Sequence, residues 1–359
     1  IIIIYHYTFF MSIKRKENMN LSDFDYNLPE HLIAQTPLEH RDSSRLLVMG
    51  RHSGNIEHRH FYDIADYLRA GDVLILNDSK VIPARIYGKR QCSGGVVETL
   101  LLKAVAENEW EALVKPGRKA NVGQVIEYGQ SLVGTVESVT ADGNRIIKFN
   151  YNGKNIYEIL DKIGNMPIPP YIKEKLSDKN RYQTVYAKHL GSAAAPTAGL
   201  HFTKELLNRL KEKGVIIKYV TLHVGLGTFR PVKTEDITKH IMHSEHYFIP
   251  EDTEEEIIAA KKQGRRVICV GTTSVRTVES AFDKNINLIS RSDDTDIFIY
   301  PGYEFKVVDA LITNFHLPQS TLMMLVSAFS SREMIMKAYR EAIASEYRFF
   351  SFGDAMFIV

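Results

Sequence analysis

Four segments of the chain place residue types that can do chemistry at the end of a predicted strand. In each, an apolar run is followed by small or hydroxylated residues and at least one titratable or cationic side chain. Ligands of α/β proteins bind beyond the carboxyl ends of strands, so we expect the four loops to form one pocket. The segments are GSAAAPTAGLHFT with Thr197 and His201, TLHVGLGTFRPV with His223 and Arg230, VGTTSVRT with Thr272, Thr273, Ser274 and Arg276, and LITNFHLPQS with Asn314 and His316.

The first of these segments, residues 191–203, consists largely of small, hydroxylated and turn-forming residues before it reaches His201. Such residues bury little apolar area, while Gly and Pro set special backbone angles, which favours a backbone that something approaches closely. A long ordered loop without a function is the alternative. Long loops inside compact domains are uncommon and usually functional, so we expect a binding role.

The segment VGTTSVRT is typical of a strand that enters a helix. Thr272, Thr273 and Ser274 would lie at the helix start, where hydroxyls and unpaired backbone N–H groups can bind a carboxylate or a phosphate. Arg276 in the first turn would add positive charge. Alternatively, Ser274 is a plain N-cap and Arg276 lies on the surface. In HVGLGTF the third glycine and the helix of a dinucleotide-binding motif are missing, so we interpret Arg230 as an anion clamp or the segment as a tight turn.

The segment KHIMHSEH places three histidines at intervals of three residues, which invites a metal-site interpretation. On a helix this spacing spreads the side chains around the cylinder, and no thiolate is available to help, so we expect no metal site. His243 remains a candidate acid/base group, because imidazole titrates near neutrality and the neighbouring Glu245 can tune it.

The C-terminal segment YRFFSFGDAM combines aromatic residues with two charged ones. Aromatic faces can hold a cation or a flat base. We expect Phe350 and Phe352 to be ordinary core residues, whereas Arg348 and Asp354 are candidates for ligand binding.

The elements that must position these residues follow from the apolar pattern. With 359 residues, 44% of them hydrophobic, the chain can bury a sizeable core and form two domains. Between about residues 84 and 160, short alternating apolar segments are separated by Gly-containing turns, which indicates an antiparallel barrel or meander. Helices and strands alternate in the C-terminal part. We therefore expect an α/β (α+β) fold, in which residues 19–80 and 162–359 form a mixed α/β catalytic domain and residues 81–161 an inserted β-barrel-like domain.

The formal net charge of +2 does not by itself indicate a polyanionic partner. Residues 1–18 account for it, with Lys14, Arg15 and Lys16 against Glu17, so the remainder is formally neutral. Any nucleic-acid binding would use a local patch. Residues 80–130 hold eight Lys or Arg against five Glu, which makes the insert the expected place; a solvated charged face is the alternative. The candidates for RNA contacts are Lys80, Arg85, Lys115, Arg118 and Lys119.

Cysteine usage and the first residues bear on the compartment. Cys92 and Cys269 lie far apart without a CxxC spacing, which suggests neither a disulfide framework nor a thiolate metal site and fits a reducing cytoplasm. The apolar start IIIIYHYTFF is too short to span a bilayer, and basic residues follow it instead of preceding it. We expect residues 1–18 to be an upstream extension or a start-site artefact, with a poorly ordered tail as the alternative, and no membrane attachment.

Longer motifs carry a resemblance to a known family. They include YNLPEHLIAQTPLEHRDSSRLLV, GDVLILNDSKVIPAR, MPIPPYI, AAPTAGLHFT, LHVGLGTFRPV, MHSE, VGTTSVRTVES, TDIFIYPGYEFKVVDALITNFHLP and YRFFSFGDAM. From Met19 to Val359 the chain resembles the S-adenosylmethionine:tRNA ribosyltransferase-isomerases of queuosine biosynthesis. Ser79, Ala193 and Ser330-Ser331 stand where the family usually has Thr, Val and Ala-Gly, and none of these departures removes a polar group.

The resemblance implies an enzyme that transfers the ribosyl part of S-adenosylmethionine to an aminomethyl-deazaguanine in a tRNA anticodon. The sugar is isomerised, epoxyqueuosine forms, and adenine and methionine are released. It also implies a β-barrel domain inserted into a larger α/β domain, and S-adenosylmethionine as co-substrate. We expect no other cofactor, no metal, a monomer and a cytoplasmic location.

The implied chemistry suggests roles for the residues above. A base must take the proton beside the sulfonium and an acid must assist the departure of adenine, and we assign proton transfer to His201, His223 and His243. Thr272, Thr273 and Arg276 would hold the methionine carboxylate, and Asp354 or Asp309 would engage hydroxyls or the sulfonium. Two alternatives stay open, a methyltransferase that uses S-adenosylmethionine and a non-catalytic RNA-binding protein built on the β insert.

Overall fold

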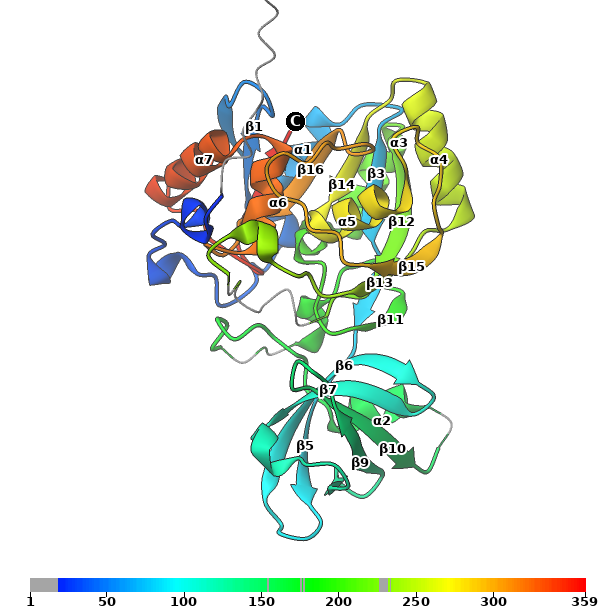
Figure 1. Cartoon of the computed structure of the whole chain (residues 1–359). Coiled ribbons are helices and arrows are strands. Elements are labelled where there is room, and N and C mark those ends of the chain that lie inside the picture. Colours follow the sequence, from blue (N-terminus) through cyan, green and yellow to red (C-terminus); the bar gives the residue numbers. More distant parts are fainter. Residues whose placement is uncertain (1–18, 154, 175, 177, 226–231, 233) are drawn as a thin grey trace, which may run out of the picture.

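The computed structural model describes residues 19–153, 155–174, 176, 178–225, 232 and 234–359. Within these residues, a nine-stranded mixed sheet and a closed six-stranded antiparallel barrel form two separate units (Figure 1). The barrel lies below the sheet and its helices in that view. The fold class predicted from the sequence is confirmed.

The large sheet brings the carboxyl ends of its central strands to one edge. Four neighbouring strands, β12, β3, β14 and β16, run parallel to one another, so their last residues lie side by side. The complete order is β15 (Ser292–Thr295), β13 (Glu245–Phe248), β12 (Ile216–Leu222), β3 (Val73–Asn77), β14 (Val267–Val270), β16 (Ala310–Asn314), β17 (Ala355–Ile358), β1 (Arg45–Met49) and β2 (Ile56–His60).

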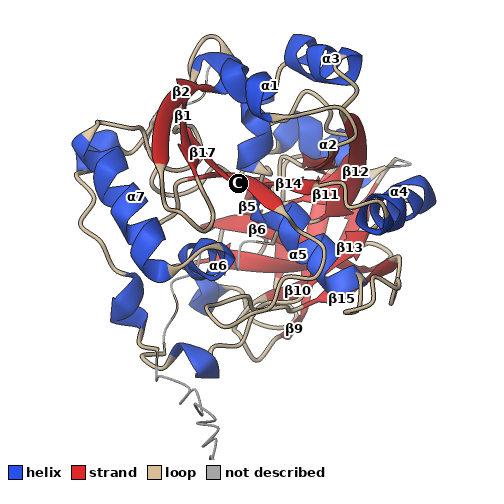
Figure 2. Ribbon diagram, turned by 90° about the horizontal axis from the view of Figure 1, so that it is seen from above, coloured by secondary structure: helices blue, strands red, loops and turns tan. Residues whose placement is uncertain are grey.

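Helices cover both faces of this sheet, as a continuous apolar strand such as β3 predicts. Val73 and Ile75 of β3 belong to one hydrophobic core, while Leu74 and Leu76 belong to the core on the other face. The first core also contains residues of α4 (Glu251–Lys262), α5 (Gly271–Ala281), α6 (Thr321–Phe329) and α7 (Arg332–Ala344), and the second contains residues of α1 (Ile64–Tyr67) and α3 (Lys204–Glu212). Figure 2 shows these helices around the sheet from above.

The barrel has a core of its own, in which Trp110, Tyr128 and Phe149 are buried. Helix α2 (Ile156–Ile163) packs against it through Leu160. Outside the barrel, β4 (Ser79–Val81) pairs with β11 (His189–Ser192), and these two strands lie between the barrel and the sheet. The barrel strands are β5 (Arg85–Arg90), β6 (Val96–Ala106), β7 (Glu109–Lys115), β8 (Val125–Glu127), β9 (Leu132–Val139) and β10 (Arg145–Tyr151).

Short 3-10 helices carry several residues that matter below. They are η1 (Leu21–Phe24), η2 (Glu30–Leu32), η3 (Arg41–Ser43), η4 (Phe61–Asp63), η5 (Gly117–Lys119), η6 (Lys179–Tyr182), η7 (Thr197–His201) and η9 (Ile237–Lys239). Both cysteines are free thiols, Cys92 exposed and Cys269 buried. Among the described residues, no helix has the length and apolarity that crossing a membrane requires.

Candidate active site

A pocket lies at the carboxyl ends of β14 and β16, where the parallel strands were expected to bring the loops together. It contains about 700 Å³ of space free of protein atoms, including its solvent-open part. Three of the four strand-end segments contribute directly, through Ala194 to Ala198, through Thr272 and Thr273, and through Thr313 to Leu317. Among the described residues of the remaining segment, Val224 is the one that reaches the wall. We call this the first pocket.

The small residues of 191–203 are required by close packing. Ala194, Ala195 and Ala198 are buried and line the first pocket. Gly191 has a φ of +141°, and a Cβ there would lie 3.0 Å from the His223 ring. A Cβ on Gly199 would overlap the hydroxyl of Tyr186. The glycines therefore admit neighbouring side chains, while the alanines leave room for a ligand.

The start of α5 offers polar groups to the first pocket. Gly271 has a φ of +81° and begins the helix, so Thr272 and Thr273 reach the pocket wall. The hydroxyl of Thr273 is buried and has no hydrogen-bond partner among the described residues. A helix N-terminus also presents free N–H groups and a partial positive charge. This corner suits a carboxylate.

Ser274 and Arg276 lie behind this corner and not in the pocket. Ser274 is fully buried, and its hydroxyl donates to the Val270 carbonyl. Arg276 is also buried; it forms an ion pair with Glu245 and donates to the Thr295 carbonyl. This corrects the expectation that both side chains meet the substrate, because each is already engaged inside the protein.

His201 is held in a defined orientation at the end of η7. Its Nδ1 lies 2.7 Å from the Ser44 hydroxyl, and its ring stacks on Phe61 with 4.9 Å between the ring centroids. Its Nε2 is buried and has no partner among the described residues. Burial lowers the pKa of His201 to about 4; the nearby Asn314 side chain and the Arg41 backbone oppose this shift, while the charges of Arg348 and Arg41 reinforce it. The imidazole is therefore neutral at neutral pH, with one nitrogen free.

Asn314 and His316 lie in the first pocket, at the end of β16. Asn314 donates to the Phe350 carbonyl over 2.9 Å, and its side-chain oxygen has no partner among the described residues. His316 places its Nε2 2.9 Å from the Thr313 hydroxyl, and burial lowers its pKa to about 3. Asn314 therefore offers the pocket a free acceptor, and His316 is a neutral ring with a fixed partner.

The other predicted histidines do not line the first pocket. His223 follows β12 and packs over Gly191. Its Nδ1 has no partner in the described structure, and burial lowers its pKa to about 4, with His246 and His189 contributing. Sequence analysis missed His189, whose Nε2 lies 3.6 Å from Asp78. His243 is half-buried in the loop before β13. The three candidates for proton transfer therefore do not share one site, and only His201 is in a pocket wall.

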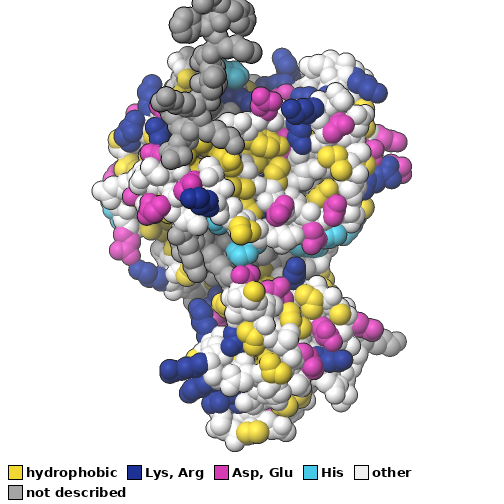
Figure 3. Space-filling view, in the orientation of Figure 1, with side chains coloured by type: hydrophobic (Ala, Val, Ile, Leu, Met, Phe, Trp, Pro, Cys, Tyr) yellow, Lys and Arg dark blue, Asp and Glu magenta, His cyan; other side chains and the backbone are white. Residues whose placement is uncertain are grey.

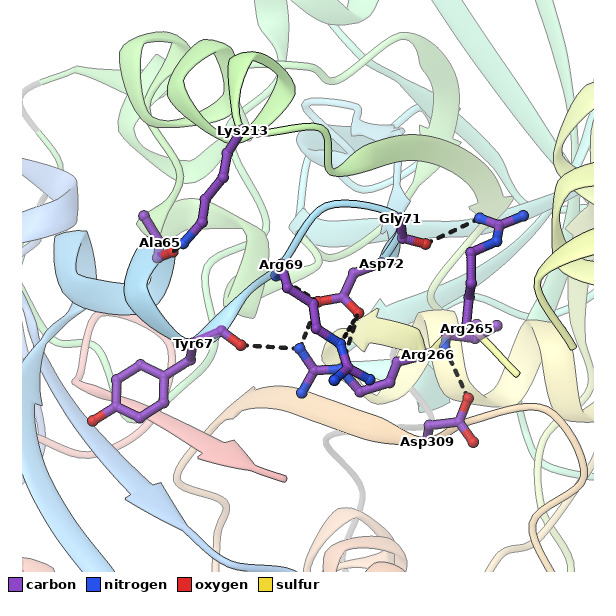
Figure 4. Close-up of polar contacts among 10 residues, drawn as sticks. Ala65, Tyr67, Arg69, Gly71, Asp72, Lys213, Arg265, Arg266 and Asp309 are labelled. Carbon is purple, nitrogen blue, oxygen red and sulfur yellow. Dashed lines mark hydrogen bonds and ion pairs between the residues drawn. The ribbon is translucent and has the colours of Figure 1, made fainter. Parts of the chain in front are cut away.

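The two predicted aspartates have structural partners. Asp309 lies just before β16, at the amino end of the sheet, where it accepts from Lys261 and from the Val267 N–H, both at 2.8 Å. Figure 4 shows it there beside Arg265 and Arg266. Asp354 accepts the backbone N–H groups of Arg45 and Arg348, each at 2.8 Å. The expected substrate contact of Asp309 is corrected, since it lies at the opposite edge of the sheet from the first pocket. For Asp354, which accepts one backbone N–H on each oxygen, substrate contact stays a prediction, because a carboxylate oxygen can accept more than one hydrogen bond.

The remaining predicted positions are placed as follows. Thr197 lines the first pocket, and Arg348 lies near His201 and donates to the Thr36 carbonyl. Arg230 lies outside the described residues.

In and next to the barrel, the side chain of Arg85 pairs with Glu98 at 3.6 Å. Figure 3 shows Lys and Arg side chains gathered on one side of the barrel. The exposed basic candidates are Lys80, Lys115, Arg118 and Lys119.

No group of three or more His, Cys, Asp or Glu side chains in the described part of the chain is arranged to hold a metal ion. The three histidines at 240, 243 and 246 instead have separate surroundings. His246 pairs with Asp294 at 2.9 Å, while the ring of His240 packs against Phe298.

Comparisons with known proteins extend over nearly the whole chain. A family model described as a queuosine biosynthesis protein matches residues 21–358. Proteins named S-adenosylmethionine:tRNA ribosyltransferase-isomerase from Clostridioides difficile and Finegoldia magna are each 58% identical over 341 residues, which is 95% of this chain and 100% and 98% of theirs. The crystal structure of an S-adenosylmethionine tRNA ribosyltransferase from Thermotoga maritima is similar with a TM-score of 0.54 and 40% identity, covering 94% of this chain and 100% of that one.

Proposed function

Because the chain belongs to the queuosine biosynthesis family of S-adenosylmethionine:tRNA ribosyltransferase-isomerases, we propose that its first pocket binds S-adenosylmethionine for that reaction. The chain is a transferase and isomerase, with S-adenosylmethionine and tRNA as its substrates. It transfers the ribosyl part of S-adenosylmethionine to the aminomethyl-deazaguanine of the anticodon and isomerises it to the epoxide, with release of adenine and methionine.

The first pocket supports this assignment by the residues of its wall. Its wall combines apolar side chains with a few polar groups, as is typical of cofactor sites. The alanines of η7 and the preceding loop leave room for a nucleoside. Thr272, Thr273 and the N-terminus of α5 provide donors for the methionine carboxylate, since helix N-termini stabilise anions. Asn314 and His316 are placed to contact the rest of the ligand.

His201 is the proposed proton acceptor, and the observation that carries this role is its buried Nε2 without a partner. A neutral imidazole can take the proton beside the sulfonium, and a pKa of about 4 keeps the ring neutral at neutral pH. The hydrogen bond between Nδ1 and the Ser44 hydroxyl fixes the ring, and Nε2 is free to accept a proton in the tautomer in which Nδ1 is the donor. His201 does not itself line the first pocket but interacts with Asn314, which does. His223 and His243 remain candidates, and neither lines the first pocket.

The barrel and the linking strand β4 provide the proposed RNA surface. We propose that residues 81–161 form a domain that contacts the anticodon stem through Lys115, Arg118 and Lys119, with Lys80 beside it, because these side chains are exposed. Lys and Arg bind phosphates without reading sequence. The two free thiols suit the cytoplasm, where tRNA is modified.

The test is an incubation with S-adenosylmethionine and an anticodon stem-loop RNA that carries the aminomethyl-deazaguanine. We expect free adenine and a gain in RNA mass for the wild type, and neither for His201→Asn. The exposed His52 provides a matched control in His52→Asn, which should turn over normally. Undiminished turnover by His201→Asn would exclude the histidine as the base. Transfer of a labelled methyl group, or RNA binding without consumption of S-adenosylmethionine, would instead support the methyltransferase or the binding-protein alternative.

A further inference from the structure

A second pocket is lined by the end of η7, Leu200 and His201, whereas Thr197 and Ala198 at its start line the first. It contains about 320 Å³ of free space, and its wall includes Arg41, Arg181, Leu200, His201 and Ser351. Ser351 also belongs to the wall of the first pocket. The two pockets therefore meet at Ser351, and His201 lies in the wall of the second pocket with Asn314 of the first pocket beside it.

The second pocket is bordered by the cations of Arg41 and Arg181. Arg41 donates to the carbonyls of Gln183 at 2.7 Å and Asn180 at 3.0 Å. Arg181 donates in return to the carbonyls of Glu39 at 3.1 Å and Leu38. Among the described residues, no carboxylate lies within ion-pair distance of either guanidinium. Neutral carbonyls thus hold the two side chains in place, and the Asp178 carboxylate acts on Arg41 only from beyond ion-pair distance.

A third arginine, Arg348, lies near the second pocket, and three buried nitrogens of the surrounding side chains lack hydrogen-bond partners in the described part of the chain. Arg348 donates to the carbonyl of Thr36, the residue before Pro37 in the pocket wall; the Asp354 carboxylate acts on it electrostatically, but among the described residues no carboxylate lies within ion-pair distance. Its Nη1 is buried without a hydrogen-bond partner, and so are Nε of Arg181 and Nε2 of His201. His201 is only 5% exposed. Buried polar groups are normally satisfied, so two such nitrogens on wall residues, Arg181 and His201, with a third on the neighbouring Arg348, point to a ligand with acceptor oxygens.

We propose that the second pocket binds a backbone phosphate of the RNA substrate, adjacent to the nucleotide that reacts at the first pocket. This rests on the proposed function, because it needs an RNA substrate. Arginine forks match the oxygens of a phosphate, and clustered arginines are the usual way to hold one. The methionine carboxylate already has donors at the start of α5, whereas the phosphate has none in the first pocket. Both pockets have Ser351 in their walls, which makes the phosphate next to the reacting nucleotide the one that we assign to the second pocket.

The experiment measures how RNA affinity depends on salt. Each phosphate that a protein neutralises steepens the plot of log affinity against log salt by about 0.9. For Arg41→Gln and for Arg181→Gln we expect a slope lower by about 1 and RNA affinity at low salt weaker by about tenfold. The matched control is Arg340→Gln, an exposed arginine of α7, which should leave both quantities unchanged. The probe is the anticodon stem-loop RNA with the aminomethyl-deazaguanine.

The affinity for S-adenosylmethionine alone, measured by equilibrium dialysis without RNA, separates the two anions that the pocket could take. It should be unchanged in both variants. Weaker binding of S-adenosylmethionine with an unchanged RNA slope would assign the arginines to the carboxylate and overturn the proposal. Arg348→Gln provides a second test if the first two variants do not fold, and an unchanged slope there would also overturn it.

Failure of this proposal is distinguishable from failure of the proposed function. A wild type that releases adenine in the presence of RNA, with variants that keep the full salt slope, contradicts only the phosphate site. A wild type that neither binds the RNA nor releases adenine contradicts both.

Discussion

The buried imidazole of His201 makes the stability of the folded protein depend on pH in a way that His201→Asn should remove. The pKa of His201 is lowered from 6.5 to about 4, chiefly by burial. A group whose pKa is lower in the folded state binds its proton first in the unfolded state, so acid favours unfolding. This destabilisation is absent above about pH 6.5 and grows as the pH falls towards about 4.

The magnitude follows from the two pKa values. On going from pH 7 to pH 5, protonation of His201 should lower the free energy of unfolding by about 2 kcal/mol. The whole difference between the two pKa values corresponds to about 3 kcal/mol. Asn is the chosen replacement because its side-chain amide can take the place of Nδ1 and keep the hydrogen bond with Ser44. The other buried histidines titrate in both proteins, so their contributions cancel in the comparison.

Urea unfolding of wild type and His201→Asn at pH 7 and pH 5 provides the measurement. The variant is expected to be less stable at pH 7, because a packed ring is lost, but to lose about 2 kcal/mol less than the wild type on going to pH 5. The exposed His52 serves as the control, since its imidazole is in water in both states. Equal pH dependence of wild type and His201→Asn would refute the inference that this ring is buried and neutral.

Three further predictions concern the first pocket and the residues near it. Thr273→Val removes a hydroxyl that has no partner in the described structure, so stability should hold while affinity for S-adenosylmethionine, measured by calorimetry, falls about tenfold; an unchanged affinity would remove Thr273 from the site. Arg276→Met leaves the Glu245 charge buried and should lower the free energy of unfolding in urea by about 3–5 kcal/mol, with partial recovery on adding Glu245→Gln; a loss below about 1 kcal/mol would contradict a buried pair. Asp309→Asn should leave adenine release unchanged and lower stability by no more than about 1 kcal/mol, whereas lost turnover in a folded variant would return Asp309 to the site.

The convergence of the loops could be predicted because it depends only on strand direction. Apolar runs that end in small and hydroxylated residues are visible in the sequence, and parallel strands bring such ends to one edge. This placed Thr197, Thr272, Thr273, Asn314 and His316 correctly in one pocket wall. The prediction that Asp309 contacts substrate together with Asn314 could have been avoided. Asp309 precedes β16 and Asn314 ends it, so the two residues must lie about 16 Å apart along the strand.

Side-chain direction within an element was harder to predict. A Ser or Thr near the start of a helix can face a ligand or bond to a carbonyl four residues earlier, and Ser274 does the second with Val270. Arg276 has its partner Glu245 on a distant strand, and no local pattern announces that pairing. The second pocket was missed for the same reason, since Arg41 and Arg181 lie in segments without regular periodicity and meet only in the folded chain.

Substrate recognition and proton transfer are linked through His201 if the second pocket binds a phosphate. After burial, the positive charges of Arg348 and Arg41 are what lower its pKa. An anion held among these arginines would offset their field, favour the protonated ring and raise the pKa, which makes the imidazole a stronger base. In the free enzyme the His201 imidazole would then be a weak base. Binding of the RNA would raise its pKa, so that the base becomes stronger only when the acceptor nucleotide is present. Repeating the urea titrations with inorganic phosphate tests this link, because the difference between wild type and His201→Asn at pH 5 should shrink, and an unchanged difference would show that the arginines and the histidine act independently.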